Sequence, residues 1–354
     1  MEKGVVKQRR SGQVYAELLC DFMFKRLFGS EANKDILIGF LNMLLDDVEI
    51  VHVDFISTEH LGLTEQDRKA VFDISCRCLD GSSFIIEMQK GYQRHFRERA
   101  VYYTTYPINA QGREAREKYI KENPDNETMS GFSWDYNLKP VTVVAVLNFR
   151  FEHSESWPSD RYHSSYRLRE DVSGEVMTEV LRFVFLELGR FRKRIWELES
   201  VFDKWMYLLK HMHELESIPE KFSDPLFRRL FMLSEIANFT PMELEQYENS
   251  LKDMSDYYNI IRTAEEDAEQ RGLAKGLAKG LAQGREEGRE EGLEAGLQQG
   301  REEGLEQGLQ QGREEGREEG KAKAIATMLA SGIPVETIAT AFGMTVEECL
   351  SCKN

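Results

Sequence analysis

A glycine stands at every fourth position from Gly272 to Gly320, thirteen in all. Each glycine costs an isolated helix about 1 kcal/mol relative to alanine, so the full set costs on the order of 10 kcal/mol. The Arg, Glu and Gln residues between the glycines exclude a membrane helix that packs through a glycine track. Residues 266–320 are therefore either disordered or a helical arm that self-associates along its glycines, and we favour the arm.

The same segment carries much of the negative charge. Sixteen acidic and eight basic side chains within residues 264–320 give a net charge of −8, which is half of the −16 of the whole chain. The remainder is only mildly acidic. A negative balance disfavours nucleic acid as a partner. It does not exclude an enzyme that acts on DNA, because such an enzyme requires only a locally basic cleft.

The sequence indicates neither export nor membrane insertion. The start, MEKGVVKQRRSGQ, is polar and basic, and no apolar run approaches the roughly 20 residues of a membrane span. The cysteines lack the spacing of a four-ligand zinc site, and we expect all of them to be reduced. A cytoplasmic protein without a membrane partner is predicted. The cysteines are Cys20, Cys76, Cys78, Cys349 and Cys352.

Hydrophobic periodicity predicts an α/β fold in the first half of the chain. The predicted elements are two short helices within 15–45, strands at 50–57, 71–79 and 84–89, a helix at 92–117 and a strand at 141–149. The last strand, VTVVAVLNF, is apolar along its length, as expected of a strand that is buried on both faces. The core order is thus αβββαβ. Two further strands within 161–190 and a helical region over 195–262 follow.

The strands predicted within 71–89 carry the strongest chemical signal. Their apolar residues alternate with Asp73, Glu87 and Gln89, so these three polar side chains are predicted to face away from the apolar set. A three-residue hairpin loop at 80–82 then pairs Asp73 with Gln89 and leaves Glu87 as a diagonal neighbour of Asp73. The two carboxylates are close enough in this register to share a cation.

Two carboxylates beside an amide suit Mg²⁺, which prefers oxygen ligands and retains waters for a substrate phosphate. The Met88 carbonyl is a further candidate ligand, and Gln89 a candidate to orient the attacking water. In phosphodiester hydrolysis such an ion activates water and offsets developing negative charge. The alternative is that Asp73 and Glu87 form the polar face of an exposed hairpin.

The motifs resemble those of the Rpn family of recombination-promoting nucleases and transposases, a branch of the PD-(D/E)XK nucleases. The resemblance covers about residues 15–210, and the glycine repeat and short helical tail are also usual for that family. The matching stretches are DFMFKRLFG (21–29), FDIS (72–75), IIEMQ (85–89), FRERAVYY (96–103) and the strand that ends in LNF (147–149).

This resemblance implies a restriction-endonuclease-like fold and a DNA endonuclease that depends on Mg²⁺, for which Mn²⁺ can substitute. It also implies a role in recombination, mobile elements or defence against phage. On that pattern Asp73 and Glu87 are the metal-binding acids, and together with Gln89 they form the catalytic set. Gln89 stands where most of the wider superfamily has Lys.

Four further positions match family motifs and are candidate supporting or DNA-binding residues. Asp21 and Lys25 lie four apart on the first helix, where either Asp21 reaches the metal site or the two form a surface ion pair. Arg99 and Tyr102 resemble an Arg-x-x-Tyr motif. Arg99 is expected either to grip a phosphate or to form a structural salt bridge.

Four parts are expected on this basis. They are a PD-(D/E)XK nuclease core (1–150), a strand pair and helical extension of it (151–265), the glycine-repeat arm (266–320) and a short helical tail (321–354). The tail resembles a helix-turn-helix fragment but lacks basic residues, which favours a packing or assembly module over DNA binding.

Two alternatives to a nuclease remain, an inactive scaffold and a DNA-binding accessory protein of a transposition system. Transposition through three dispersed acids is disfavoured, because the acids cluster in one hairpin. Metalloprotease and serine-hydrolase signatures, HExxH and GxSxG, are absent from the sequence.

Overall fold

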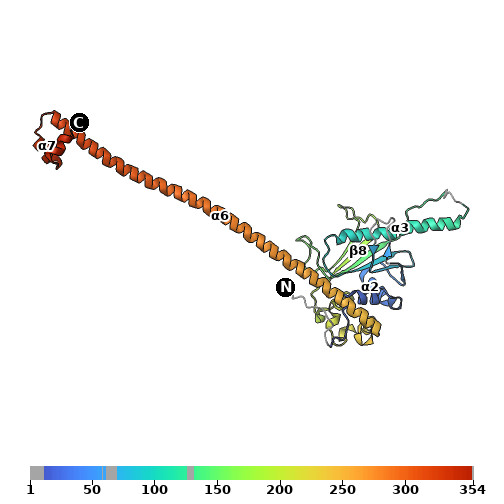
Figure 1. Cartoon of the computed structure of the whole chain (residues 1–354). Helices are drawn as coiled ribbons and strands as arrows, with labels where there is room; N and C mark the ends of the chain where they lie inside the picture. The colour runs from blue at the N-terminus through green and yellow to red at the C-terminus, as the bar shows by residue number, and fades with distance from the viewer. Residues whose placement is uncertain (1–11, 58, 61–69, 126–130, 353–354) are drawn as a thin grey trace. The chain divides into compact units, whose positions relative to one another are not determined.

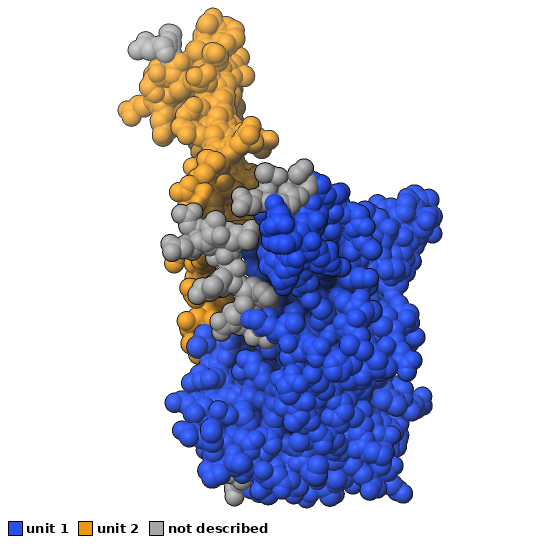
Figure 2. Space-filling view, turned by 90° about the vertical axis from the view of Figure 1, so that its right-hand side faces the viewer, with its two compact units in different colours: residues 1–262 blue, residues 263–354 orange. Residues whose placement is uncertain are grey.

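The computed structural model describes residues 12–57, 59–60, 70–125 and 131–352, which divide between two compact units, Met1–Arg262 and Thr263–Asn354 (Figure 2). The first unit is a mixed α/β structure, which confirms the predicted class. Its elements, in chain order, are α1 (Asp21–Phe28), α2 (Lys34–Leu44), β1 (Asp54–Phe55), β2 (Glu59–His60), β3 (Ala70–Val71), β4 (Ile74–Arg77), β5 (Ser83–Gln89), α3 (Phe96–Glu122), β6 (Val141–Leu147), β7 (His163–Arg167), β8 (Leu181–Glu187), α4 (Val201–His211) and α5 (Pro225–Ser234).

A six-stranded mixed sheet forms the centre of this unit. Its strand order is β1-β4-β5-β6-β8-β7, and β2 and β3 form a separate two-stranded sheet. Strands β5, β6 and β8 are parallel to one another, whereas the outer pairs are antiparallel. All seven residues of β6 are buried, in agreement with its apolar sequence. The carboxyl ends of β5, β6 and β8 therefore lie along the same edge of the sheet.

Helices cover both faces of the sheet. One hydrophobic cluster joins α1, α2, α4 and α5 to one face, and Trp205 of α4 is fully buried in it. A smaller cluster joins Phe96, Ala100 and Tyr103 of α3 to the other face. Figure 1 shows α2 and α3 on opposite sides of the strands. The sheet is thus buried on both sides over β5 and β6.

The β4–β5 hairpin has a different loop from the predicted one. Gly81 has φ 88°, and the Cys78 amide donates to the Ser82 carbonyl at 2.8 Å, so the loop is residues 79–81 and not 80–82. The third position of a three-residue loop is left-handed, a conformation that Gly adopts freely and Ser does not. The predicted register is therefore wrong by one position in each strand.

The strand predicted at 50–57 is also shorter than expected. Only β1 pairs with β4, and the backbone of Ile50 is bonded elsewhere. The Ile50 amide donates to the Asn42 side-chain oxygen at 2.7 Å, and the Asn42 amide donates to the Ile50 carbonyl at 2.8 Å. A helix side chain thus satisfies backbone groups that a strand partner would otherwise satisfy.

The glycine repeat lies within α6 (Pro241–Ala330), which begins in the first unit and continues into the second. A Cβ built on any of the repeat glycines meets no atom within 4 Å. In the second unit the end of α6 packs against α7 (Val335–Phe342) and α8 (Val346–Ser351) around a small core of Ile325, Ile338, Ala339 and Cys349. None of the described helices has the length and apolar character that crossing a membrane requires.

Candidate active site

Asp73 lies where the chain bends just before β4. Strict alternation would place Phe72 and Ile74 on the same face of the sheet, as the sequence pattern predicted. In the structure Phe72 packs in the cluster beneath α3, whereas Ile74 packs in the cluster on the opposite face. The chain therefore turns at Asp73, and its side chain is half-buried at the end of the strand.

The carboxylate of Asp73 contacts the neighbouring strand β5. Its Oδ2 accepts a hydrogen bond from the Met88 amide at 2.7 Å, and the Asp73 amide donates to Oε1 of Glu87 at 3.3 Å. Ile74 pairs with Ile86 in the antiparallel ladder, so continuing the ladder by one pair places Glu87 opposite Asp73. The predicted pairing of Asp73 with Gln89 is therefore wrong, because the hairpin loop begins one residue earlier.

The Met88 carbonyl points toward the same side as Asp73. Within a strand the N–H and C=O of one residue point the same way, and the next residue points the opposite way. The Gln89 carbonyl accepts from the Asn148 amide at 2.9 Å, on the side of β6. Met88 consequently directs both of its backbone groups toward the end of β4, where its amide is bonded to Asp73.

Glu87 and Gln89 project toward α3 and not into open solvent. Their exposed fractions are 2% and 9%, so the polar face that the alternation predicted is not the face of an exposed hairpin. The Gln89 amide Nε2 donates to Oε2 of Glu87 at 3.0 Å. One oxygen of Glu87 thus accepts from Gln89 and the other from the Asp73 amide.

Burial and a neighbouring negative charge raise the pKa of both acids. Desolvation, and then the charge of Asp73, raises the pKa of Glu87 from 4.5 to about 8. Desolvation, and then the charge of Asp21, raises the pKa of Asp73 against the effects of the Met88 amide, Lys25 and Lys90. Each of these adjacent acids disfavours ionisation of the other. A cation bound between them would favour the state in which both are ionised.

Asp21 and Lys25 of α1 form an ion pair at 3.1 Å, and both side chains are about half exposed. Together with Lys90, which follows β5, they line a cleft of about 690 Å³ between α1 and the start of α6. All three also act electrostatically on Asp73. Asp21 and Lys25 thus form the surface ion pair that was one of the two alternatives, and this pair lies near enough to Asp73 to act on its charge.

Arg99 and Tyr102 of α3 differ in their placement. The Arg99 guanidinium lies over the rings of Phe96 and Tyr103, at 5.1 and 5.5 Å, and its charge lowers the pKa of Glu87. Its Nε is buried without a hydrogen-bond partner among the described residues, and no ion pair to Arg99 is formed there. Tyr102 is exposed and accepts from the Tyr106 hydroxyl at 2.9 Å.

Two residues near the acids were missed in the sequence. Tyr103 is buried beside them, and burial, followed by the charge of Glu87, raises its pKa to about 12. Tyr103 lies four residues after Arg99, and Tyr102 lies three residues after it. Both spacings place the tyrosine on the same helix face as Arg99. Lys90 directly follows Gln89 and provides positive charge near Asp73 that Gln89 does not supply.

Within the described residues, no group of three His, Cys, Asp or Glu side chains is arranged to hold a metal ion. The candidate ligand set therefore consists of the Asp73 and Glu87 carboxylates and the Met88 carbonyl. These are hard oxygen donors, which suit Mg²⁺ and leave room for waters. Burial raises the pKa of each acid, and a cation held between them would favour their ionised forms.

Comparison with known proteins identifies the family of this chain. No curated protein and no solved structure matches the chain. The profile of one family, described as PD-(D/E)XK nuclease family transposase, matches residues 18–264. This range contains both sheets, the two acids and the helices that cover them. The chain therefore belongs to the PD-(D/E)XK nuclease family transposases.

Proposed function

We propose that this protein is an endonuclease that hydrolyses DNA phosphodiester bonds with Mg²⁺, or Mn²⁺ in its place, in recombination, mobile elements or phage defence. The observation that carries the proposal is the meeting of Asp73 and Glu87 at the ends of adjacent strands, joined through the Met88 and Asp73 amides. Asp73, Glu87 and the Met88 carbonyl are the proposed metal ligands. A bound Mg²⁺ supplies an activated water and stabilises charge on the leaving oxygen.

Each neighbouring residue has a proposed part in this reaction. Gln89 holds Oε2 of Glu87 and so fixes the direction of the other carboxylate oxygen. Lys25 and Lys90 line the cleft beside Asp73 and attract the DNA phosphates. Arg99, stacked on aromatic rings, favours the ionised form of Glu87. Asp21 adds negative charge near Asp73 and orients Lys25 through their ion pair.

A plasmid-nicking assay tests this proposal. The wild type should relax supercoiled DNA with Mg²⁺ or Mn²⁺ and stop in EDTA. Asp73→Asn and Glu87→Gln, which preserve side-chain size, should each lower the rate by at least about a hundredfold. Glu216→Gln, on an exposed residue away from the acids, is the matched control. Equal activity in all four proteins would refute the assignment, provided that urea unfolding shows each to be folded.

A DNA-binding accessory role, or an inactive scaffold, is the second candidate function. The specific observation in its favour is that Gln89 carries no positive charge and donates to Glu87. An accessory protein binds DNA with the same affinity in EDTA and Mg²⁺, and neither an accessory protein nor a scaffold cuts it. Gln89→Lys discriminates the two, because a restored cation at this position should raise cleavage by a nuclease and leave an accessory protein inactive.

We also propose that the chain forms homo-oligomers through α6 and acts in the cytoplasm. Seven leucines that directly follow repeat glycines are 56–75% exposed, an apolar track that a second copy would cover: Leu273, Leu277, Leu281, Leu293, Leu297, Leu305 and Leu309. Truncation after residue 265 should lower the mass measured by light scattering. The five cysteines are free thiols, which supports a reducing compartment.

A further inference from the structure

A second cleft, of about 680 Å³, lies away from the acids at the ends of β7 and β8. Residues 158–163, residues 190, 192 and 193, and Phe202 of α4 contribute its lining. Four of the lining side chains are cations, and one is a carboxylate, in a chain whose net charge is −16. The cations are Arg161, Arg190, Arg192 and Lys193, and the carboxylate is Asp160.

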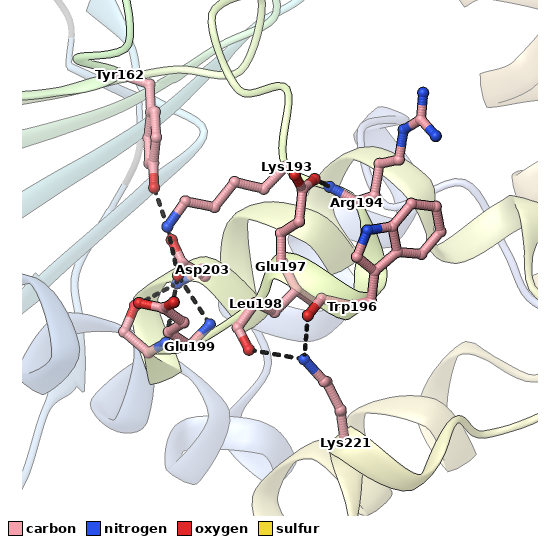
Figure 3. Close-up of polar contacts among 10 residues, drawn as sticks. Tyr162, Lys193, Arg194, Trp196, Glu197, Leu198, Glu199, Asp203 and Lys221 are labelled. Carbon is pink, nitrogen blue, oxygen red and sulfur yellow. Dashed lines mark hydrogen bonds and ion pairs between the residues drawn. The ribbon is translucent and has the colours of Figure 1, made fainter.

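Buried acids behind the cleft fix two of these cations. Lys193 Nζ lies 2.8 Å from Oδ2 of Asp203, and the Tyr162 hydroxyl donates to Oδ1 of Asp203 at 2.7 Å. Figure 3 shows the side chains of Lys193 and Tyr162 converging on Asp203. Arg190 is held in the same way by Glu187, at 3.0 Å. These contacts order the wall of the cleft and neutralise Lys193 and Arg190.

The uncompensated charge therefore belongs to Arg161 and Arg192. Both are exposed, and neither has a carboxylate partner among the described residues. Arg161 lies over the Trp157 ring at 5.2 Å, which limits its freedom without neutralising it. His163, beside them, has a buried Nε2 without a hydrogen-bond partner in the described part of the chain. The pair presents free guanidinium groups of the kind that bind phosphate.

Strand register places this cleft on the same sheet edge as the acids. Gln89 pairs with Leu147, and Leu147 pairs with Glu187, so the three form one row across β5, β6 and β8. The Glu187 amide donates to the Tyr162 carbonyl at 2.8 Å, which extends the row to the chain segment before β7. Three strand spacings of about 4.8 Å separate Gln89 from Tyr162 by roughly 14 Å.

We propose that the cleft at Arg161 and Arg192 binds the phosphodiester backbone of the substrate DNA, a few nucleotides away from the point at which the acids act. The inference rests on the proposed nuclease function, which supplies DNA as the ligand. Consecutive nucleotides of one B-form strand rise 3.4 Å, so 14 Å corresponds to about four nucleotides. The cleft thus sets the position of the duplex on the sheet edge through backbone contacts, which carry no sequence information.

Binding without cleavage provides the test. Fluorescence anisotropy of a labelled duplex in EDTA measures the affinity of full-length wild type, Arg192→Ala and Arg161→Gln/Arg192→Ala over 50–200 mM salt. The double variant should bind about tenfold more weakly, and its slope of log affinity against log salt should be smaller by about 2. Arg228→Ala, an exposed arginine of α5, is the matched control and should bind as the wild type does.

The outcomes separate this inference from the proposed function. Equal affinity and slope in the double variant and Arg228→Ala would overturn the cleft as a DNA site. If the double variant loses affinity while wild type never cuts DNA, the cleft stands and the nuclease function fails. If the double variant loses affinity, and Asp73→Asn loses cleavage but keeps wild-type affinity and slope, both stand.

Discussion

Replacement of Glu87 by glutamine should change how the stability of the protein depends on pH. The pKa of Glu87 rises from 4.5 to about 8 on folding, because the carboxyl is buried and adjacent to Asp73. Below pH 4.5 the acid is neutral in both folded and unfolded chains and has no effect. As the pH rises from 4.5 through 8, the unfolded state ionises first, and the folded state loses stability relative to it.

The size of this loss follows from the shift. Each pH unit corresponds to about 1.4 kcal/mol, and the interval from 4.5 to about 8 gives a ceiling of about 5 kcal/mol above pH 8. Glutamine remains neutral at every pH and escapes the loss. Its amide cannot accept from both the Asp73 amide and Gln89, as the carboxylate does, which costs about 1 kcal/mol. Glu87→Gln should therefore be more stable than wild type by about 3–4 kcal/mol at pH 9 and comparable to it at pH 5.

Urea unfolding in EDTA at pH 5, 7 and 9 measures the free energy of unfolding of each protein. Glu216→Gln is the control, and its pH profile should match that of the wild type. Addition of Mg²⁺ at pH 9 should stabilise the wild type and leave Glu87→Gln nearly unchanged, because only the ionised pair binds the ion. Parallel profiles of wild type and Glu87→Gln over the whole pH range would refute the buried-acid geometry.

Three further perturbations have expected outcomes. Asp203→Asn removes the charge that holds Lys193, and urea unfolding should show a loss of about 2–3 kcal/mol; wild-type stability would contradict the role of this buried acid. Trp205→Ala leaves a cavity in the main core and should cost about 3–5 kcal/mol in the same assay, whereas a loss below 1 kcal/mol would contradict its full burial. In the double variant Gly292→Ala/Gly296→Ala, the added Cβ atoms have no atom within 4 Å, so circular dichroism should show equal or greater helicity. A lower mass by light scattering would mark the glycines as the contact between copies.

Much of the fold could be predicted because its signals are local. The apolar run of β6 gave its type and nearly its bounds, and the helical spacing within 15–45 gave two helices with the break between them. The turn signal at Asp80 and Gly81 gave the hairpin. Its register was not predictable by alternation alone, since it depends on which loop position is left-handed, and Gly81 decides this. A single-residue error in the loop moved the partner of Asp73 from Glu87 to Gln89.

The candidate site was only partly predictable for a different reason. Alternation indicates that Glu87 and Gln89 share a face, but not that α3 covers this face. The bend at Asp73 separates Phe72 from Ile74, and no local pattern marks it. Contacts between residues that are distant in the sequence likewise cannot be predicted from local patterns. The ion pair of Lys193 with Asp203 is one, and it depends on how α4 packs beside β7 and β8.

Crystals soaked with Mn²⁺ provide the most direct test of the proposed metal site. We expect one anomalous-scattering peak within bonding distance of the carboxylates of Asp73 and Glu87 and of the Met88 carbonyl, and we expect this peak to be lost in Asp73→Asn crystals grown in the same form. A peak that persists in this variant, or wild-type crystals with Mn²⁺ bound elsewhere and none between the two acids, would contradict it.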